Sequence, residues 1–161
     1  MHKRLFIFTG LLLQCISLGA QSIGQEHQAL AAFLKRMYLA APFEGVKIVE
    51  DYDHQYMISV ISLEKAKYPN PSVMSRVATV KAQAQASNFI NGARIDAETI
   101  IHTTETKDSS GRQQTITETI EKIKMNSSGF VQGMQLLHSF DASEPRTVFV
   151  YSAKLQPQTK P

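Results

Sequence analysis

The stretch NPSVMSRVATVKAQAQASNFING, residues 70–92, limits what this chain can fold into more than any other part of it. Asn70 suits a helix N-cap, because its side-chain oxygen can accept a hydrogen bond from a backbone N–H of the first turn. Pro71 fits the first helical position, where no N–H is needed. We therefore predict a helix over residues 71–91. We expect Gly92 to end it in the left-handed conformation, which glycine adopts without a Cβ penalty.

Apolar and small side chains recur along this predicted helix at helical spacing. One stripe consists of Val73, Val77, Val80, Ala84 and Ser87. A neighbouring set widens that stripe and consists of Ala78, Ala82, Ala86, Phe89 and Ile90. Small side chains on one side of a helix permit close approach to another layer, so we expect this side to pack on a β-sheet.

Strand-like segments lie on both sides of this helix in the sequence. Residues 45–62 change to a period of two around the polar sequence EDYDH, residues 50–54, which predicts a β-hairpin. Residues 95–106 are rich in β-branched side chains and predict a strand. Two apolar-rich runs, about 129–140 and 146–155, predict a second antiparallel hairpin.

The segment between these strands has a mixed pattern. KDSSGR, residues 107–112, predicts a loop. Residues 113–126 stay open between helix and strand, because Ile116, Ile120 and Ile123 keep helical spacing whereas the threonines suit a strand. We favour a short helix or an irregular crossover here.

An amphipathic segment precedes the first hairpin. QEHQALAAFLKRMYLA, residues 25–40, places apolar side chains at helical spacing and predicts a short helix that ends before Pro42. The elements together predict an α+β fold, a single domain in which an antiparallel sheet packs against one long helix plus this short N-terminal helix. The predicted divisions are a signal peptide at 1–20, a helical segment at 21–44, the α+β domain at 45–155 and a flexible tail at 156–161.

The first twenty residues, MHKRLFIFTGLLLQCISLGA, have the features of a secretory signal peptide, with a basic start, an apolar stretch and small residues at the end. We expect cleavage after Ala20 and no transmembrane helix afterwards, because the apolar stretch is shorter than the roughly 20 residues that span a bilayer. A second interpretation is lipidation at Cys15, although Gln14 stands where lipoproteins carry a small residue. Cleavage after Ala20 would leave 141 of the 161 residues and no cysteine, so no disulfide would hold the fold.

The charge of the chain excludes one class of partner. The formal charge of +3 includes Lys3 and Arg4, so removing the leader would leave +1. Proteins that bind nucleic acids concentrate positive charge on one face, whereas the lysines here are scattered. Aromatic residues of the last hairpin could stack on bases, but core packing explains them better; they are Phe130, Phe140, Phe149 and Tyr151. We therefore predict no nucleic-acid partner.

Two groups of residues are weak candidates for a metal or ligand site. Asp51 and Asp53 in EDYDH offer oxygen ligands two positions apart, although the calcium-loop pattern is absent. Glu98 and His102 are four apart, so a strand would place them on the same face. A solvated turn and an exposed sheet face explain both groups better. We predict no metal, no cofactor and no catalytic residue.

The sequence also gives little support for a catalytic serine. The motifs SSG at 109–111 and 127–129 lack the strand-to-helix elbow of serine hydrolases, and we interpret each as a turn or a strand entry. Gly129 and Gly133 are therefore assigned structural roles, as are four residues of the long helix and its ends. Those four are Asn70, Pro71, Phe89 and Gly92.

Four passages, YMISVISL, NFINGARIDAET, MNSSGFVQGMQLLHSF and TVFVYSAKL, match a known pattern. They resemble the LPP-twenty lipoprotein family and the related N-terminal domain of flagellar assembly protein T. In those domains an Ala-rich helix ends in a glycine, a strand with Ser or Thr follows, and a serine–glycine step opens a strand that pairs with the last one. The matching positions are Ala78, Ala82, Ala86, Phe89, Gly92, Ile95, Thr99, Ser128, Gly129, Gly133 and Val150.

The resemblance covers roughly residues 55–155 and implies a small α+β domain in the envelope of a Gram-negative bacterium, with no catalytic residues to carry over. The departure at Gln14 puts a lipid anchor in doubt, and fold likeness does not establish function. We expect an exported, non-enzymatic, envelope-associated protein, in the periplasm or at the outer envelope, that contacts another envelope protein or a surface component. The alternative is a small-molecule or metal-binding periplasmic module, including a hydrolase, and the oligomeric state stays open.

Overall fold

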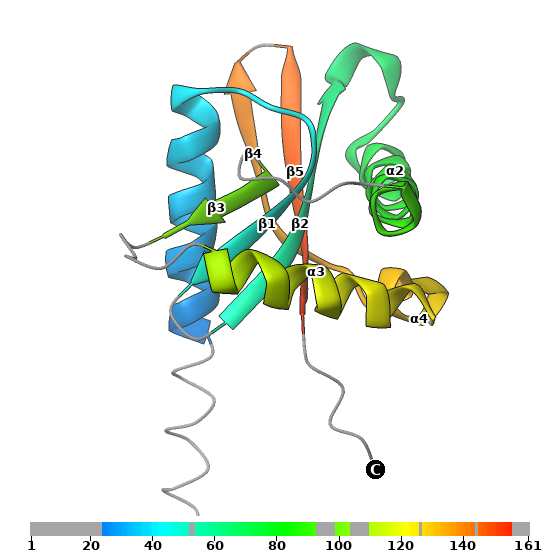
Figure 1. Cartoon of the computed structure of the whole chain (residues 1–161). Helices are drawn as coiled ribbons and strands as arrows, with labels where there is room; N and C mark the ends of the chain where they lie inside the picture. The colour runs from blue at the N-terminus through cyan, green and yellow to red at the C-terminus, as the bar shows by residue number, and fades with distance from the viewer. Residues whose placement is uncertain are drawn as a thin grey trace, which may run out of the picture.

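Helices cover both faces of a five-stranded β-sheet (Figure 1). The computed structural model describes residues 24–51, 54–92, 99–103, 110–125, 127–143 and 145–155. Residues 24–40 form the N-terminal helix, which packs on one face of the sheet, and three later helices pack on the other face. This arrangement confirms the predicted α+β class and single domain. The predicted signal peptide and C-terminal tail lie outside the described residues.

After the N-terminal helix, the chain forms a hairpin, a long helix, a short strand, two further helices and a second hairpin. In chain order these elements are β1 (Gly45–Asp51), β2 (His54–Glu64), the 3-10 turn η1 (Lys65–Lys67), α2 (Pro71–Gly92), β3 (Ile100–His102), α3 (Ser110–Lys124), α4 (Ser127–Gln132), β4 (Gln135–Ser143) and β5 (Arg146–Lys154).

The strands are arranged in the order β3-β1-β2-β5-β4, so β2 is central and β4 forms one edge. The first predicted hairpin is confirmed, because β1 and β2 pair antiparallel from Gly45↔Val60 to Asp51↔His54. The sheet is mixed rather than wholly antiparallel, since β3 pairs parallel with β1. Only residues 100–102 of the predicted strand 95–106 form a described strand; residues 95–98 and 104–106 lie outside the described part of the chain.

The second predicted hairpin is also confirmed, as β4 pairs antiparallel with β5, but its first strand begins later than predicted. Residues 129–132 belong to the helix α4, so Gly129 opens no strand and Phe130 lies in a helix. The backbone N–H of Gly133 donates to the carbonyls of Gly129 and Phe130 at 3.2 and 3.1 Å, which closes that helix. Val131 is buried and Phe130 packs against the same core, so apolar burial decides in favour of the helix.

The long helix α2 begins as predicted. The backbone N–H of Val73 donates to Oδ1 of Asn70 at 3.0 Å, and that of Met74 donates to the Asn70 carbonyl at 3.2 Å. Asn70 is therefore the N-cap, and Pro71 is the first helical residue. At the other end Gly92 is still helical and does not adopt the left-handed conformation, so the predicted cap at this residue was wrong. The left-handed glycine that the described residues do contain is Gly45, with φ of 117°, where β1 begins.

The predicted valine stripe of α2 was wrong in part. The buried residues are spaced by four, whereas Val80 is 65% exposed and Ala84 is exposed as well. Residues spaced by four form a ridge that is inclined to the helix axis, and the buried residues of α2 form such a ridge against the twisted sheet. Only one of two neighbouring stripes can face the sheet, and the alanines permit the closer approach. The buried stripe consists of Met74, Ala78, Ala82, Ala86 and Ile90.

Residues 113–126, for which the sequence did not decide between helix and strand, are helical as far as Lys124 and form part of α3. Ile116, Ile120 and Ile123 are buried at helical spacing, which matches the favoured interpretation. The hydroxyl of Thr119 donates to a carbonyl one turn earlier at 2.9 Å, so this threonine is satisfied within a helix. The predicted loop 107–112 was wrong at its end, because α3 already begins at Ser110. Both SSG motifs thus lead into helices, since serine suits a helix start as well as a turn.

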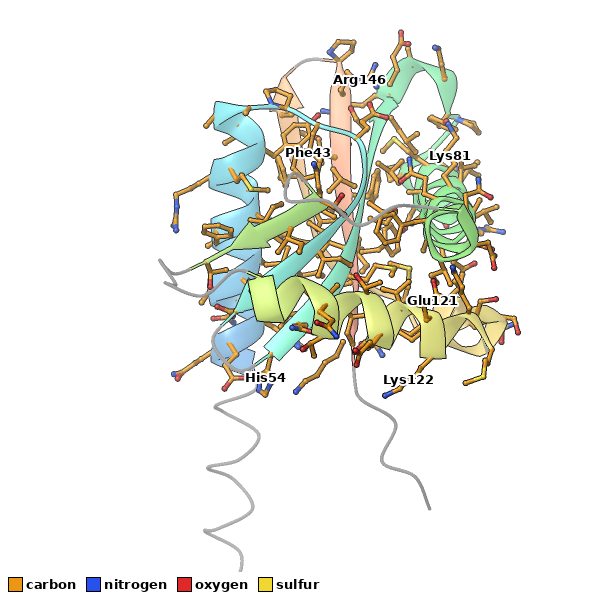
Figure 2. The ribbon with its side chains drawn as sticks, in the orientation of Figure 1. Phe43, His54, Lys81, Glu121, Lys122 and Arg146 are labelled. Atoms are coloured by element: carbon orange, nitrogen blue, oxygen red, sulfur yellow. The ribbon has the colours of Figure 1, made fainter. Side chains whose placement is uncertain are left out.

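Period-two alternation divides the apolar side chains of the sheet between two cores. Met57 and Ile61 of β2 pack against α2 and its neighbours, whereas Ile58 and Val60 pack against the N-terminal helix. Leu34 of that helix is 2% exposed, so the N-terminal helix is fixed to the domain by burial. Figure 2 shows side chains filling both interfaces, while Lys122 lies on the outer side of α3.

Candidate functional site

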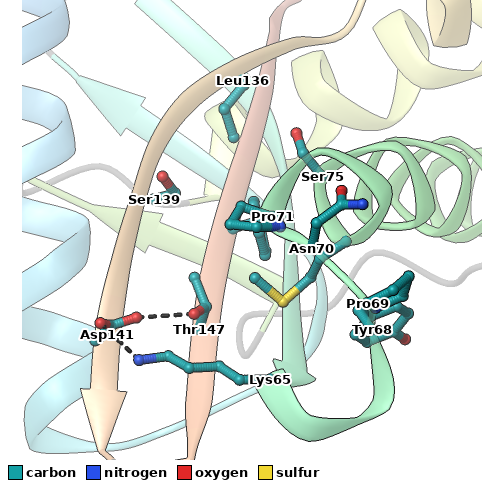
Figure 3. A pocket seen from close by; sticks show the side chains of 12 residues that line it. Lys65, Tyr68, Pro69, Asn70, Pro71, Ser75, Leu136, Ser139, Asp141 and Thr147 are labelled. Atoms are coloured by element: carbon teal, nitrogen blue, oxygen red, sulfur yellow. Dashed lines mark hydrogen bonds and ion pairs between the residues drawn. The ribbon is translucent and has the colours of Figure 1, made fainter.

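A groove of about 590 Å³ lies between the start of α2 and the edge strand β4 (Figure 3). Met74 of α2, Phe149 of β5 and Leu136 of β4 contribute apolar walls. Leu136 is 45% exposed, which is unusual for a large apolar side chain of the sheet. We call this hollow the α2–β4 groove.

Local geometry explains why these elements surround the groove. The chain leaves β2 at Glu64, and the backbone N–H of Lys65 donates to the carbonyl of Pro145 at 2.8 Å, which ties the turn after β2 to the β4–β5 connection. The sequence YPNP then directs the chain into α2, and the Asn70 cap fixes where the helix begins. The first turn of α2 therefore stands beside β4 and β5, with the groove between them.

A fixed polar group occupies one end of the α2–β4 groove. Nζ of Lys65 lies 2.8 Å from Oδ2 of Asp141, and the hydroxyl of Thr147 donates to Oδ1 of Asp141 at 2.8 Å (Figure 3). The hydrogen bonds from Lys65 and Thr147 lower the pKa of the Asp141 carboxyl below its usual value. Because the pair is exposed, it adds little to stability. Its effect is to hold a charged carboxylate and an ammonium group in place at the groove.

A second hollow, of about 390 Å³, lies between the N-terminal helix and β4. Lys35 and His27 of the helix line it together with Leu137 and His138 of β4. Nζ of Lys35 lies 5.5 Å from the ring centroid of Phe140, and the His138 ring stacks on the same phenyl ring at 5.7 Å. We call this hollow the N-helix groove.

The structure describes one side chain of the four predicted weak candidates. Oδ1 of Asp51 accepts a hydrogen bond from the Thr103 hydroxyl at 2.7 Å, which links β1 to the residue after β3. Asp53 and Glu98 lie outside the described residues, and His102 is described only through its backbone in β3. Among the described residues, no group of three or more His, Cys, Asp or Glu side chains could hold a metal ion.

The buried serines of β2 are engaged in structural contacts. The Ser59 hydroxyl donates to Oε1 of Gln85 at 2.8 Å and thereby joins β2 to α2. Ser62 accepts a hydrogen bond from Nε of Arg146 at 2.7 Å, which joins β2 to β5. The Ser59 hydroxyl therefore joins the sheet to a helix, and the Ser62 hydroxyl joins two strands within the sheet.

Reasoning from the sequence missed both grooves. The α2–β4 groove combines Lys65, Leu136 and Asp141, which come from distant positions and show no common spacing. One local signal existed, because two adjacent leucines in QLLHSF cannot both face one side of a regular strand. Regular alternation turns Leu136 and Leu137 to opposite faces of the sheet, and the register shift of β4 between Leu136 and His138 then places His138 beside Leu137 at the N-helix groove.

Comparisons with protein-family models, with curated proteins and with solved structures found no match. Within the described part of the chain, no helix has the length and apolar character needed to cross a bilayer.

Proposed function

We propose that this protein is an exported, non-enzymatic binding domain of the cell envelope that holds a partner protein at the α2–β4 groove. The observation that carries this proposal is the exposed apolar wall at Leu136 beside a fixed Lys65–Asp141 pair. Exposed apolar surface rimmed by polar groups is typical of interaction sites. A few fixed polar atoms would orient a partner that the apolar wall attracts.

Two features of the sequence support the envelope as the location. The first twenty residues have the pattern of an export signal. The resemblance to the LPP-twenty family supports a Gram-negative host and an accessory or assembly role. We place the protein in the periplasm or at the outer envelope, with Gln21 as its first mature residue. Intact mass of the exported protein tests this placement, because lipidation at Cys15 would leave a longer, heavier chain.

Site-specific photo-crosslinking in living cells tests the proposed contact. A photoreactive side chain replaces Leu136, and a matched variant carries it in place of Val80, which is 65% exposed on α2 away from the groove. We expect a discrete crosslinked product from position 136 that is absent from position 80. Adding Asp141→Asn should weaken that product. Equal crosslinking from both positions, or from neither, would contradict the proposal.

A second candidate function is small-molecule binding in the same groove. The volume of about 590 Å³ favours it, because ligand pockets commonly measure about 300–1,000 Å³. A ligand that binds only the folded state raises the melting temperature, so a thermal-shift screen of metabolites and metal ions tests this candidate. The matched variant Leu136→Glu should lose any shift caused by the groove, whereas His102→Ala tests the predicted metal or hydrolase site. An unchanged melting temperature across the screen would remove this candidate.

A further inference from the structure

The edge strand β4 has a groove on each of its two faces. Leu136, Ser139 and Asp141 line the α2–β4 groove, whereas Leu137 and His138 line the N-helix groove. Within the described residues, β4 pairs with β5 alone, so the other side of the strand carries main-chain groups at the edge of the sheet. Both grooves therefore border the same open edge.

This arrangement matches the requirements of an added strand. Successive side chains of a strand point to opposite faces, so a segment that pairs with β4 would direct its side chains alternately toward the two grooves. Two register shifts in β4 limit the regular part of the edge to residues 138–141. An irregular edge disfavours pairing with arbitrary strands. Because the regular part of β4 is short, stable binding of an added strand would also require side chains that fit the two grooves.

Charge indicates what one set of those side chains would be. The N-helix groove presents Lys35 together with His27 and His138, and the described residues that line it include no carboxylate. Glu26 precedes His27 in the sequence, but its charge is close to Tyr56 of β2. Burial raises the pKa of the Tyr56 hydroxyl, and the negative charge of Glu26 raises it further. The groove thus favours an acidic side chain, whereas the α2–β4 groove on the other face offers Leu136, Met74 and Phe149 to an apolar one.

We propose that β4 accepts an extended segment of a partner protein as a sixth strand of the sheet, with apolar side chains toward the α2–β4 groove and acidic side chains toward Lys35. This inference rests on the proposed function and adds the conformation and the chemical class of the bound segment. Main-chain hydrogen bonds to β4 supply attachment, and the two grooves supply selectivity.

Peptide binding to the folded chain tests this inference. The probe is a nine-residue synthetic peptide that alternates Leu and Glu, and binding is followed by NMR shifts and amide-exchange protection in residues 138–141. A peptide that alternates Leu and Lys should bind at least roughly tenfold more weakly, because like charges would meet at the N-helix groove. The Lys35→Glu variant should lose binding of the Leu/Glu peptide to a similar extent. Arg36→Glu, which makes the same charge change at an exposed neighbouring position, should change the affinity less than about twofold.

Backbone N-methylation of the peptide separates strand addition from simple burial in a groove. The N–H groups of alternate residues in a strand point to opposite sides. Methylation of one alternate set should therefore abolish binding, whereas methylation of the other set should be tolerated. Equal effects of the two sets would overturn strand addition. Absence of peptide binding would also overturn strand addition. The same holds if the outer amides of β4 are already protected from exchange in the free protein, by its own chain or by a second copy.

The two proposals can fail separately. A crosslink at position 136 together with an inert Leu/Glu peptide would retain the proposed function and remove the added strand. A peptide that binds irrespective of N-methylation but is lost in Leu136→Glu would also retain the groove and remove strand pairing. Absence of both the crosslink and peptide binding would remove both proposals.

Discussion

Replacing Ala82 by leucine should destabilise the protein far more than the same change two residues later. Ala82 is fully buried at the centre of the stripe by which α2 packs on the sheet, and its neighbours Ala78 and Ala86 are fully buried as well. Ala84 lies on the same helix and is exposed. The two substitutions have the same effect on helix propensity, so their difference reports the packing of α2 on the sheet.

The magnitude follows from the absence of space at Ala82. A leucine adds three carbon atoms between a helix and a strand that already touch, so the helix must shift or the side chain must leave its preferred rotamer. Overpacking of this kind costs about 1–3 kcal/mol, and three added carbons place Ala82→Leu near the upper end. An exposed substitution such as Ala84→Leu stays within about 0.5 kcal/mol. For a chain of this size each kcal/mol lowers the melting temperature by roughly 3 °C.

Urea unfolding followed by circular dichroism measures both variants against the parent chain. We expect Ala82→Leu to lower the midpoint with an unchanged denaturant slope, which identifies a loss of stability rather than a changed unfolded state. Ala84→Leu should leave the midpoint near that of the parent. If the two variants unfold at the same urea concentration, α2 does not pack on the sheet by its alanine stripe and the assignment of faces is wrong.

Three further predictions concern the cap, the N-terminal helix and the polar end of the groove. Asn70→Ala should cost about 1 kcal/mol of unfolding free energy by calorimetry, because the first turn of α2 loses its acceptor, and an unchanged value would contradict the cap. Leu34→Ala should cost about 2–5 kcal/mol by urea unfolding, since this side chain is 2% exposed, whereas Leu39→Ala on the same helix, 51% exposed, should have little effect. The Asp141 carboxyl has a lowered pKa in the folded state, so its stabilising contribution is present above the usual value near 3.8 and is lost as the pH falls through the folded value. The parent chain should therefore lose slightly more stability between pH 7 and pH 3 than Asp141→Asn does, and equal losses in paired urea titrations would contradict a lowered pKa for this carboxyl.

Local patterns predicted much of the fold, and their failures have physical causes. Asn70 and Pro71 identified the start of α2, because capping depends on neighbours in the sequence. The same reasoning assigned residues 129–132 to a strand, since a short apolar run does not distinguish a strand from a helix. The helical spacing also placed Val80 on the buried side of α2, because two adjacent stripes of this helix are comparably apolar and the spacing does not distinguish them.

The sequence by itself determined the class of fold and the type of most elements, because hydrophobic periodicity and capping are properties of neighbouring residues. Only the tertiary structure decided which stripe of α2 faces the sheet and that β4 lies at the edge of it. It also brought Lys65, Leu136 and Asp141 to one groove, with Lys35 and His138 on the opposite face of the same strand. These relations depend on strand order and on a bulge in β4, and pairing between distant segments leaves no periodic trace along the chain.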